Sequence, residues 1–336
     1  MALRGATIYG VGSYVPEQVL TNADWERMVE TTDDWIVSHT GIRERRLAAD
    51  SQACSDLAIP AAQRALADAG IAPEQLDLVI VATVTSDYAF PATACLVQHA
   101  IGATRAGAMD LSSGCTGFLY SLATGSGFVR CGDYDHILLI SAEVLTRIAD
   151  WSDRSNCVLF GDGAGAVVLG PCDAGQGLLS YALLSRGEYG DLLMLPAGGS
   201  RKRLTAALLA QHEDCLRMAG HDIFKLAVRG IPRIAREALK KARLTTADVN
   251  VVVMHAANQR ILDAAAERMK IDPARMVSTV AKYGNTSAAS VPLCLDEVYR
   301  SGGLAEGDIV LLVGFGAGFT LGAAVLRWTL PPRSAG

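Results

Sequence analysis

Cys115 is the residue best placed for chemistry in this chain of 336 residues, because of the segment around it. A small apolar run, Ala106 to Met109, precedes it, and apolar residues recur at helical spacing after it until Gly132. The spacing predicts that the thiol lies where an extended segment turns into a buried helix. There the positive end of the helix dipole favours a thiolate, and the Cys115 N–H is free to point at an oxyanion. A small cysteine that only packs in the core is the alternative.

His255 and Asn285 are the partners that such a nucleophile would need. His255 follows an apolar run typical of a buried strand, and Asn285 lies just before a helical pattern. A thiolate can take an acyl group from a thioester, and an imidazole and an amide that donate to one oxygen can stabilise an oxyanion. Papain-like proteases use the same residue types, so composition alone leaves the reaction open. Each side chain also has a structural alternative, as a core histidine and as a cap or turn residue.

An internal repeat predicts that these three side chains meet. Three pairs of segments match: 64–82 with 237–255, 113–115 with 283–285, and 137–140 with 309–312. We therefore divide the chain into an N-terminal half with the cysteine, 1–173, and a C-terminal half with the histidine and amide, 174–336. Equivalent loops of two such halves lie around a pseudo-twofold axis. Cys115 and Asn285 would face each other across it, with His255 at the carboxyl end of a strand, where open α/β sheets hold their active sites.

The rest of the chain alternates strand and helix patterns, which predicts an α/β fold. Strands are predicted over 6–14, 76–84 and 136–141, and helices over 22–31, 55–69 and 91–101. The polar, irregular stretch from Gly187 to Asp214, with Arg201-Lys202-Arg203, is predicted to be a surface excursion. The glycine-rich segment 161–165 lacks the Lys-Ser/Thr of a phosphate loop, so we expect close backbone packing there.

Composition argues against several classes of protein. The net charge of −5 disfavours nucleic-acid binding, and no segment is long and apolar enough to span a membrane. The N-terminal residues show no signal-peptide pattern. Eight cysteines without paired spacing argue against a zinc site and a disulfide framework. These features predict a cytoplasmic protein.

Several motifs, in this order and spacing, resemble those of β-ketoacyl-acyl-carrier-protein synthase III, a condensing enzyme of the thiolase-like superfamily. The motifs are Trp35 to Arg45, Gly114 to Phe118, Phe160 to Gly165, His255 to Ile261, Tyr283 to Pro292, and Gly314 to Phe319. The resemblance extends from about Ile8 to Arg327. It implies a thiolase-like five-layered αβαβα fold made of two duplicated halves, and a homodimer.

The resemblance also implies a mechanism, the decarboxylative Claisen condensation that initiates type II fatty acid synthesis. Cys115 would accept an acyl group, usually acetyl, from acyl-CoA, and malonyl-acyl-carrier protein would then lose CO2 and attack it. His255 and Asn285 would bind the malonyl thioester oxygen. The backbone N–H groups of Cys115 and Ala317 would form the oxyanion hole of the acyl transfer. No metal and no redox cofactor has a role.

Further site residues follow from the resemblance by position. Trp35 and Arg154 would hold the CoA adenine, and Asn258 and Gly220 would line the path of the pantetheine. Phe90 would reach into the acyl pocket of the neighbouring subunit. The basic surface that docks the acidic carrier protein would consist of Lys225, Arg260 and Arg268.

Some positions depart from the family pattern without removing a catalytic group. They are His39, His221, Met254, Ala256, Glu267 and Leu321. They leave two alternatives open: a related acyltransferase or starter-unit condensing enzyme of secondary metabolism, and a non-catalytic scaffold that binds acyl-CoA or carrier protein. The intact trio of cysteine, histidine and asparagine argues against the scaffold. The sequence leaves the length of the starter acyl chain open.

Overall fold

The computed structural model describes residues 4–333 of the chain. Residues 1–3, which are part of the segment without a signal-peptide pattern, lie outside the described residues, as do 334–336. Within 4–333, no helix combines the length and the apolar character that crossing a membrane requires.

Two five-stranded sheets form the frame of the fold, and they have the same strand order. The first sheet has the order β1 (Gly5–Tyr14), β7 (Gly163–Cys172), β6 (Ile137–Glu143), β4 (Leu78–Ala82) and β5 (Gly107–Leu111). The second has the order β8 (Gly177–Ser185), β14 (Thr320–Arg327), β13 (Ile309–Gly316), β11 (Val251–Met254) and β12 (Met276–Val277). In both sheets the first two neighbouring pairs are antiparallel and the next two are parallel. This matched order confirms the predicted duplication.

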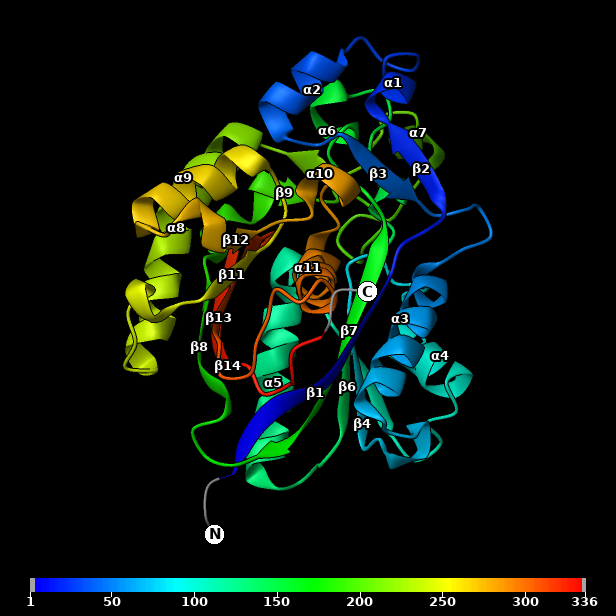
Figure 1. Ribbon diagram of the computed structural model, residues 1–336. Coiled ribbons are helices and arrows are strands. Elements are labelled where there is room, and N and C mark those ends of the chain that lie inside the picture. The colour runs from blue at the N-terminus through cyan, green and yellow to red at the C-terminus, as the bar shows by residue number, and fades with distance from the viewer. Residues whose placement is uncertain (1–3, 334–336) are drawn as a thin grey trace.

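Helices fill three layers around the two sheets (Figure 1). Between the sheets lie α5 (Gly117–Cys131) and α11 (Ser290–Arg300). The outer face of the first sheet is covered by α3 (Cys54–Ala69) and α4 (Thr93–Ala100), and that of the second by α8 (Gly220–Lys241) and α9 (Gln259–Met269). The αβαβα arrangement expected from the resemblance is therefore confirmed.

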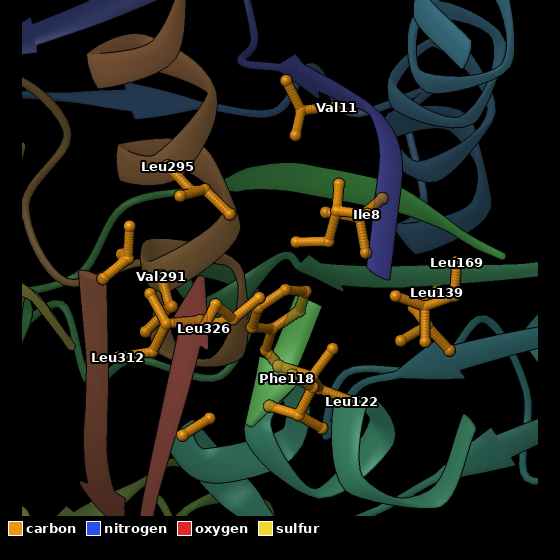
Figure 2. Close-up of a cluster of buried hydrophobic side chains, with 14 of the residues drawn as sticks. Ile8, Val11, Phe118, Leu122, Leu139, Leu169, Val291, Leu295, Leu312 and Leu326 are labelled. Carbon is orange, nitrogen blue, oxygen red and sulfur yellow. The ribbon is translucent and has the colours of Figure 1, made fainter. Parts of the chain in front are cut away.

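The middle layer is buried because both sheets pack their inner faces on it. Phe118 and Leu122 of α5 and Val291 and Leu295 of α11 meet side chains of both sheets, as Figure 2 shows. Strands β4 and β13, covered on both faces, consist mostly of Val, Ile and Leu, with all their residues buried. The two helices that begin beside the reacting groups are thus held by the main core.

The two halves also match in local detail. Beyond α3, Gly70 has φ +65°, and beyond α8, Arg243 has φ +59°, so both helices end in a left-handed residue. After each end the chain bonds back to the last turn, from Ile71 N–H to Leu66 O and from Leu244 N–H to Leu239 O. A short turn then leads into β4 or β11, as the repeat predicts.

The remaining elements lie at the end of the molecule above the sheets (Figure 1). They are β2 (Gln18–Thr21) paired with β3 (Glu44–Leu47), β9 (Leu193–Met194) paired with β10 (Arg217–Met218), and the helices α1 (Asn22–Trp25), α2 (Asp33–Thr40), α6 (Arg154–Cys157), α7 (Ala206–Leu209) and α10 (Val280–Tyr283).

The predicted helix 22–31 is mostly wrong. Only α1 forms, and its cap is Thr21, whose hydroxyl accepts from the Asp24 N–H while the Asp24 carboxylate accepts from the Thr21 N–H. Asn22 is instead buried, and its amide donates to Asp33 and to the Ile42 carbonyl. These bonds tie the start of the helix to residues further along the chain, and the helix ends after one turn.

Candidate functional site

Cys115, His255 and Asn285 line one cavity of about 100 Å³, as the repeat predicts. Cys115 lies in a single 3₁₀ turn, η2 (Gly114–Thr116), between β5 and α5. His255 directly follows β11, and Asn285 lies between α10 and α11. All three side chains are at least nine-tenths buried. The site is therefore formed at the point where the two halves meet.

Main-chain bonds fix Asn285 to the first half. Its N–H donates to Leu159 O at 2.8 Å, and its carbonyl accepts from Gly161 N–H at 3.1 Å. A Cβ at Gly161 would collide with the Tyr283 carbonyl, so the close backbone packing expected for 161–165 is confirmed. The Asn285 side-chain oxygen accepts from Ser287 N–H at 2.9 Å, which leaves the NH2 group to donate into the cavity.

The Cys115 backbone is pressed against the loop that follows β13. A Cβ at Gly316 would lie 2.7 Å from the Cys115 nitrogen, so only glycine permits this approach. The N–H groups of Ala317 and of Cys115 itself lie near the sulfur and lower the pKa of the thiol. The two donors expected to form an oxyanion hole therefore both lie beside the nucleophile.

Burial decides the protonation state of the nucleophile. Desolvation raises the pKa of the Cys115 thiol to about 11, although the Ser287 hydroxyl, 3.4 Å from the sulfur, and the two N–H groups pull it down. The thiolate expected from the helix dipole is therefore wrong for the ligand-free chain. The dipole is weaker than the cost of burying a charge, so the nucleophile rests as a thiol.

His255 is held neutral, with its proton on Nδ1. Burial lowers the pKa of its imidazole to about 3. Ser290 Oγ donates to Ser287 O at 2.8 Å and has only one proton, so the contact of 2.7 Å with His255 Nδ1 requires Nδ1–H to donate. The other ring nitrogen, Nε2, then carries a lone pair.

Sequence reasoning missed Ser287, Ser290 and Glu143. Ser287 contacts the sulfur, Ser290 sets the histidine tautomer, and Glu143 accepts a hydrogen bond from Ser287 at 3.1 Å. One signal was available for Glu143: it ends an apolar strand, at the same sheet edge where open α/β sheets place polar groups. The two serines follow Asn285 closely but have no pattern of their own.

Trp35 and Arg154, expected to hold the adenine, lie together but in direct contact. The Arg154 guanidinium lies 5.1 Å from the Trp35 ring centroid, and Arg154 also donates to Glu30 O at 2.7 Å. His39 stacks on the same indole with ring centroids 4.5 Å apart. A base could enter between Trp35 and Arg154 only after the guanidinium swings away.

The residues expected to line the pantetheine path do lie at the cavity. Asn258 and Gly220 line it, where α9 and α8 begin. Asn258 caps α9 by accepting from Arg260 N–H at 2.9 Å, and its amide donates to His39 O at 2.9 Å. The first turns of both helices therefore form one wall of the site.

The expected docking residues are all exposed on these two helices. Lys225 and Arg260 lie near the helix starts, whereas Arg268 lies two turns further along α9, about 12 Å from Arg260. The acidic Glu267, one of the departures, is exposed beside Arg268. Sequence reasoning missed an exposed basic stripe on α8 at helical spacing, which consists of Arg229, Arg233, Arg236 and Lys240.

The segment 187–214 is only partly the surface excursion that was expected. Leu193 and Met218, in β9 and β10, line the first cavity and also a second one of about 170 Å³. The second cavity is mostly apolar and also reaches Cys115. The Leu216 N–H donates to Ile148 O at 2.7 Å, which ties this segment over the site. We call residues 187–219 the flap.

Phe90 lies on the surface with 86% of its area exposed. It lines neither of the two cavities described above. This position is compatible with the expectation that it enters a neighbouring subunit.

The fold brings Cys215 close to an aspartate and a histidine, two other residue types that can bind a metal ion. The spacing of the cysteines in the sequence did not indicate this cluster. Atoms of Asp150, His212 and Cys215 lie within 4.8 Å of one another, and His212 Nδ1 is 3.3 Å from the Asp150 carboxylate. All three belong to the flap or to the loop beneath it. The expectation that no metal is involved stays a prediction.

Comparison with known proteins identifies the same family over both halves. Residues 109–187 match the model of 3-oxoacyl-[acyl-carrier-protein (ACP)] synthase III, and residues 239–328 match the model of its C-terminal part. The β-ketoacyl-[acyl-carrier-protein] synthase III of Desulfitobacterium hafniense is 52% identical over 96% of this chain and 97% of its own.

Solved structures agree with this result. The crystal structure of 3-oxoacyl-(acyl carrier protein) synthase III from Pseudomonas aeruginosa has a TM-score of 0.91, with 41% identity over 98% of this chain and 99% of its own. The priming β-ketosynthase of the R1128 polyketide pathway has a TM-score of 0.92, with 35% identity over 98% of both chains.

Proposed function

Because the chain belongs to the β-ketoacyl-acyl-carrier-protein synthase III family, we propose that Cys115, His255 and Asn285 carry out its decarboxylative Claisen condensation. In this reaction an acyl-CoA is condensed with malonyl-acyl-carrier protein, which initiates type II fatty acid synthesis. One observation carries the assignment: the thiol, the imidazole and the amide line a single buried cavity.

Acyl transfer is the first step. The Cys115 sulfur attacks the thioester carbonyl, and the oxygen gains negative charge between the N–H groups of Cys115 and Ala317. Preformed N–H donors in a site closed to water lower such a barrier, by about 3 kcal/mol for each donor. The thiol, imidazole and amide supply the chemistry, so we assign no metal and no redox cofactor.

Condensation is the second step. The malonyl group loses CO2, and the electron pair of the broken C–C bond forms an enolate whose oxygen the Asn285 NH2 group and His255 Nε2 stabilise. The enolate carbon then attacks the acyl carbon, and the Cys115 sulfur leaves as a thiolate. His255 can donate there only when Nε2 carries a proton. If Ser290 turns its hydroxyl from Ser287 O to Nδ1, it stabilises that tautomer. We therefore assign Ser290 the role of controlling which imidazole nitrogen faces the substrate.

The substrates would approach along the wall made by α8 and α9. CoA would lie with its adenine at Trp35 and Arg154 and its pantetheine along Asn258 and Gly220. The acidic carrier protein would dock on Lys225, Arg260 and Arg268, with the basic stripe of α8 extending that surface.

We propose a homodimer through the edge of the first sheet. Strand β5 ends that sheet, and among residues 4–333 no strand pairs with its outer side. The exposed Phe90 precedes α4, which packs on β5. Pairing of two β5 edges would cover both features and place each Phe90 at the acyl pocket of the partner.

The proposed compartment is the cytoplasm. All eight cysteines are free, as expected for a protein in a reducing compartment.

Intact-mass measurement tests the proposed roles. With acetyl-CoA, Cys115→Ser should take up no acyl group, because the hydroxyl is a far weaker nucleophile. His255→Ala should still be acylated but should lose condensation by about 100-fold or more when malonyl-acyl-carrier protein is added.

Full condensation by the His255→Ala variant would contradict the assignment, as would acetylation of another residue. Leu330→Val, at a residue that lines neither cavity, serves as a control for the preparation of the variants. A series of acyl-CoAs of increasing length in the same assay measures the starter preference.

The likeness to a polyketide priming ketosynthase favours one alternative, a starter-unit enzyme with another acyl donor. The mass assay separates the two. Acetyl-CoA as the best donor supports initiation of fatty acid synthesis, whereas strong preference for longer or unusual acyl groups supports the alternative.

A further inference from the structure

Glu143 is a buried carboxyl group that the mechanism above does not use. It ends β6, and none of its surface is exposed. Its Oε2 accepts from Thr83 Oγ1 at 3.3 Å, Val84 N–H at 3.1 Å and Thr85 Oγ1 at 2.7 Å. Within residues 4–333 it has no salt bridge to a cation. A carboxylate without a cationic partner is costly to bury, so its protonation state is finely balanced.

Its other oxygen is linked to the nucleophile by one hydroxyl group. Ser287 Oγ lies 3.1 Å from Glu143 Oε1 and 3.4 Å from Cys115 Sγ. Ser287 is itself buried, with 2% of its area exposed. A hydroxyl has one proton, so it can donate to the carboxylate while it accepts from the thiol, or donate to a thiolate while it accepts from a carboxylic acid. The three groups therefore form a path along which a proton can move.

We propose that Glu143 is a positioning residue that, through the Ser287 hydroxyl, holds the proton that Cys115 gives up when its sulfur acts as a nucleophile. The first step of this proposal concerns the thiol alone, whereas its part in the acyl cycle rests on the proposed function.

The proton balance of the cycle is closed. As the Cys115 sulfur forms its bond to the acyl carbon, the thiol proton passes to Ser287 Oγ and the Ser287 proton passes to Glu143 Oε1. The CoA sulfur leaves with the electron pair of the broken C–S bond and takes a proton from solvent. In the condensation, the Cys115 sulfur leaves the acyl carbon as a thiolate. It then regains the stored proton from Glu143 along the same path.

Burial makes Glu143 a better acceptor for the Cys115 proton than His255. Desolvation raises the pKa of Glu143 to about 7, whereas burial lowers that of His255 to about 3. A Cys115 thiol with a pKa of about 11 gives its proton more readily to the stronger base. His255 stays neutral and remains available for the malonyl oxygen.

Cys115 and Cys54 are two ionisable side chains whose pKa values the charge of Glu143 raises, and burial holds both pKa values well above 7. The pKa of Cys54, on α3, is raised well above its usual value of 9.0 by burial. Asp87 and Asp110, from the loop after β4 and from β5, act on Cys54 from farther along the site. A transition near pH 7 can therefore be assigned to Glu143.

Alkylation of Cys115 by iodoacetamide tests the proposal without acyl-CoA. Cys95 and Cys131 are exposed thiols that also react, so the rate at Cys115 is followed by mass mapping of its own peptide. From pH 5 to 10 this rate should rise through a step near pH 7, where Glu143 becomes ionised. Glu143→Gln keeps the shape of the side chain but cannot take the proton. We expect the step to vanish and the rate at pH 8 to fall by about tenfold to 100-fold.

Two further variants separate the proton path from a structural role. Ser287→Ala breaks the path and should also remove the step. Thr85→Val removes a hydrogen bond that lowers the pKa of Glu143, so the step should remain and shift to higher pH. A step that persists near pH 7 in Glu143→Gln and Ser287→Ala overturns the proposal, and so does its loss in Thr85→Val alone. Because no acyl group is involved, this result is independent of the substrate assignment.

Discussion

At the scale of single residues, burial keeps the nucleophile and the imidazole of the site uncharged. Cys115 and His255 are both neutral at pH 7, one as a thiol and one as an imidazole, because desolvation moves their pKa values in opposite directions. A neutral pair can be enclosed without a large cost. The nearby serines then decide where each proton lies.

Ser290 offers a test of this control at the residue scale. In the wild-type protein, the 15N shifts of His255 should show a protonated Nδ1 and a bare Nε2, unchanged down to about pH 4. Ser290→Ala removes the acceptor for Nδ1–H, so the tautomers should mix and condensation should change by about tenfold, while acylation of Cys115 is retained. A tautomer ratio that is the same in both proteins would refute the role of Ser290.

Residue types and spacing were sufficient to predict that Cys115, His255 and Asn285 meet at one cavity. Each lies at the end of a strand or the start of a helix that the hydrophobic pattern reveals. Ser287 and Glu143 could not be predicted in this way. Ser287 is 172 positions along the chain from Cys115 and 144 from Glu143, and hydroxyl contacts leave no periodic signal.

At the scale of elements, the unpaired edge of β5 has a defined hydrogen-bonding pattern. Gly107 N–H and Leu111 O are bonded toward β4, so Gly107, Met109 and Leu111 direct their main chain inward. By the alternation of a strand, Ala108 and Asp110 direct theirs outward. Asp110 also caps α4 by accepting from Thr93 and Ala94.

Ala108→Pro therefore tests the proposed dimer. Proline removes an outward N–H and leaves the bonds to β4 in place, so the variant should fold but dissociate into monomers. Light scattering after gel filtration measures the mass, and Phe90→Ala provides a comparison that leaves the edge intact. A dimer that survives Ala108→Pro places the interface elsewhere.

Elements whose ends are set locally were predicted well, and those set by distant contacts were not. Helices α3 and α5 end at Gly70 and Gly132, as the sequence indicates. The failed helix 22–31 and the flap depend on bonds to residues far along the chain. Leu216, for example, is fixed by Ile148.

At the scale of the whole molecule, the duplication was predictable because both halves repeat the same helix, turn and buried strand. The sheets then repeat the full strand order, which the sequence showed only in part. The site also depends on this scale, since it takes its sulfur from one half and its imidazole and amide from the other.

The free energy of unfolding of the whole protein should also depend on the protonation of these buried groups. Between pH 6.5 and 4.5 the unfolded chain binds a proton at His255, because folding lowers its pKa from 6.5 to about 3. Acid therefore lowers the free energy of unfolding by about 1.4 kcal/mol per pH unit through His255. Folding raises the pKa of Glu143 from 4.5 to about 7, so the folded chain binds that proton and acid stabilises it by a similar amount.

In the wild-type protein these two effects should offset each other. From pH 6.5 to 4.5, Glu143→Gln should lose about 2 kcal/mol relative to wild type, and His255→Gln should gain about as much. Urea unfolding at several pH values measures this, and the comparison with wild type cancels the other titrating groups. Three parallel profiles would show that neither pKa is shifted by folding.

One feature of the site also has a consequence for redesign. Asn285 is joined to Leu159 and Gly161 by main-chain bonds, and Gly316 fits its bare backbone against Cys115. The spacing of the reactive groups is thus set by backbone contacts rather than by the side chains that surround them. Leu195, Leu216 and Ile148 line the second cavity but not the first. They can therefore be replaced by smaller residues to fit a bulkier acyl chain without moving the reactive groups.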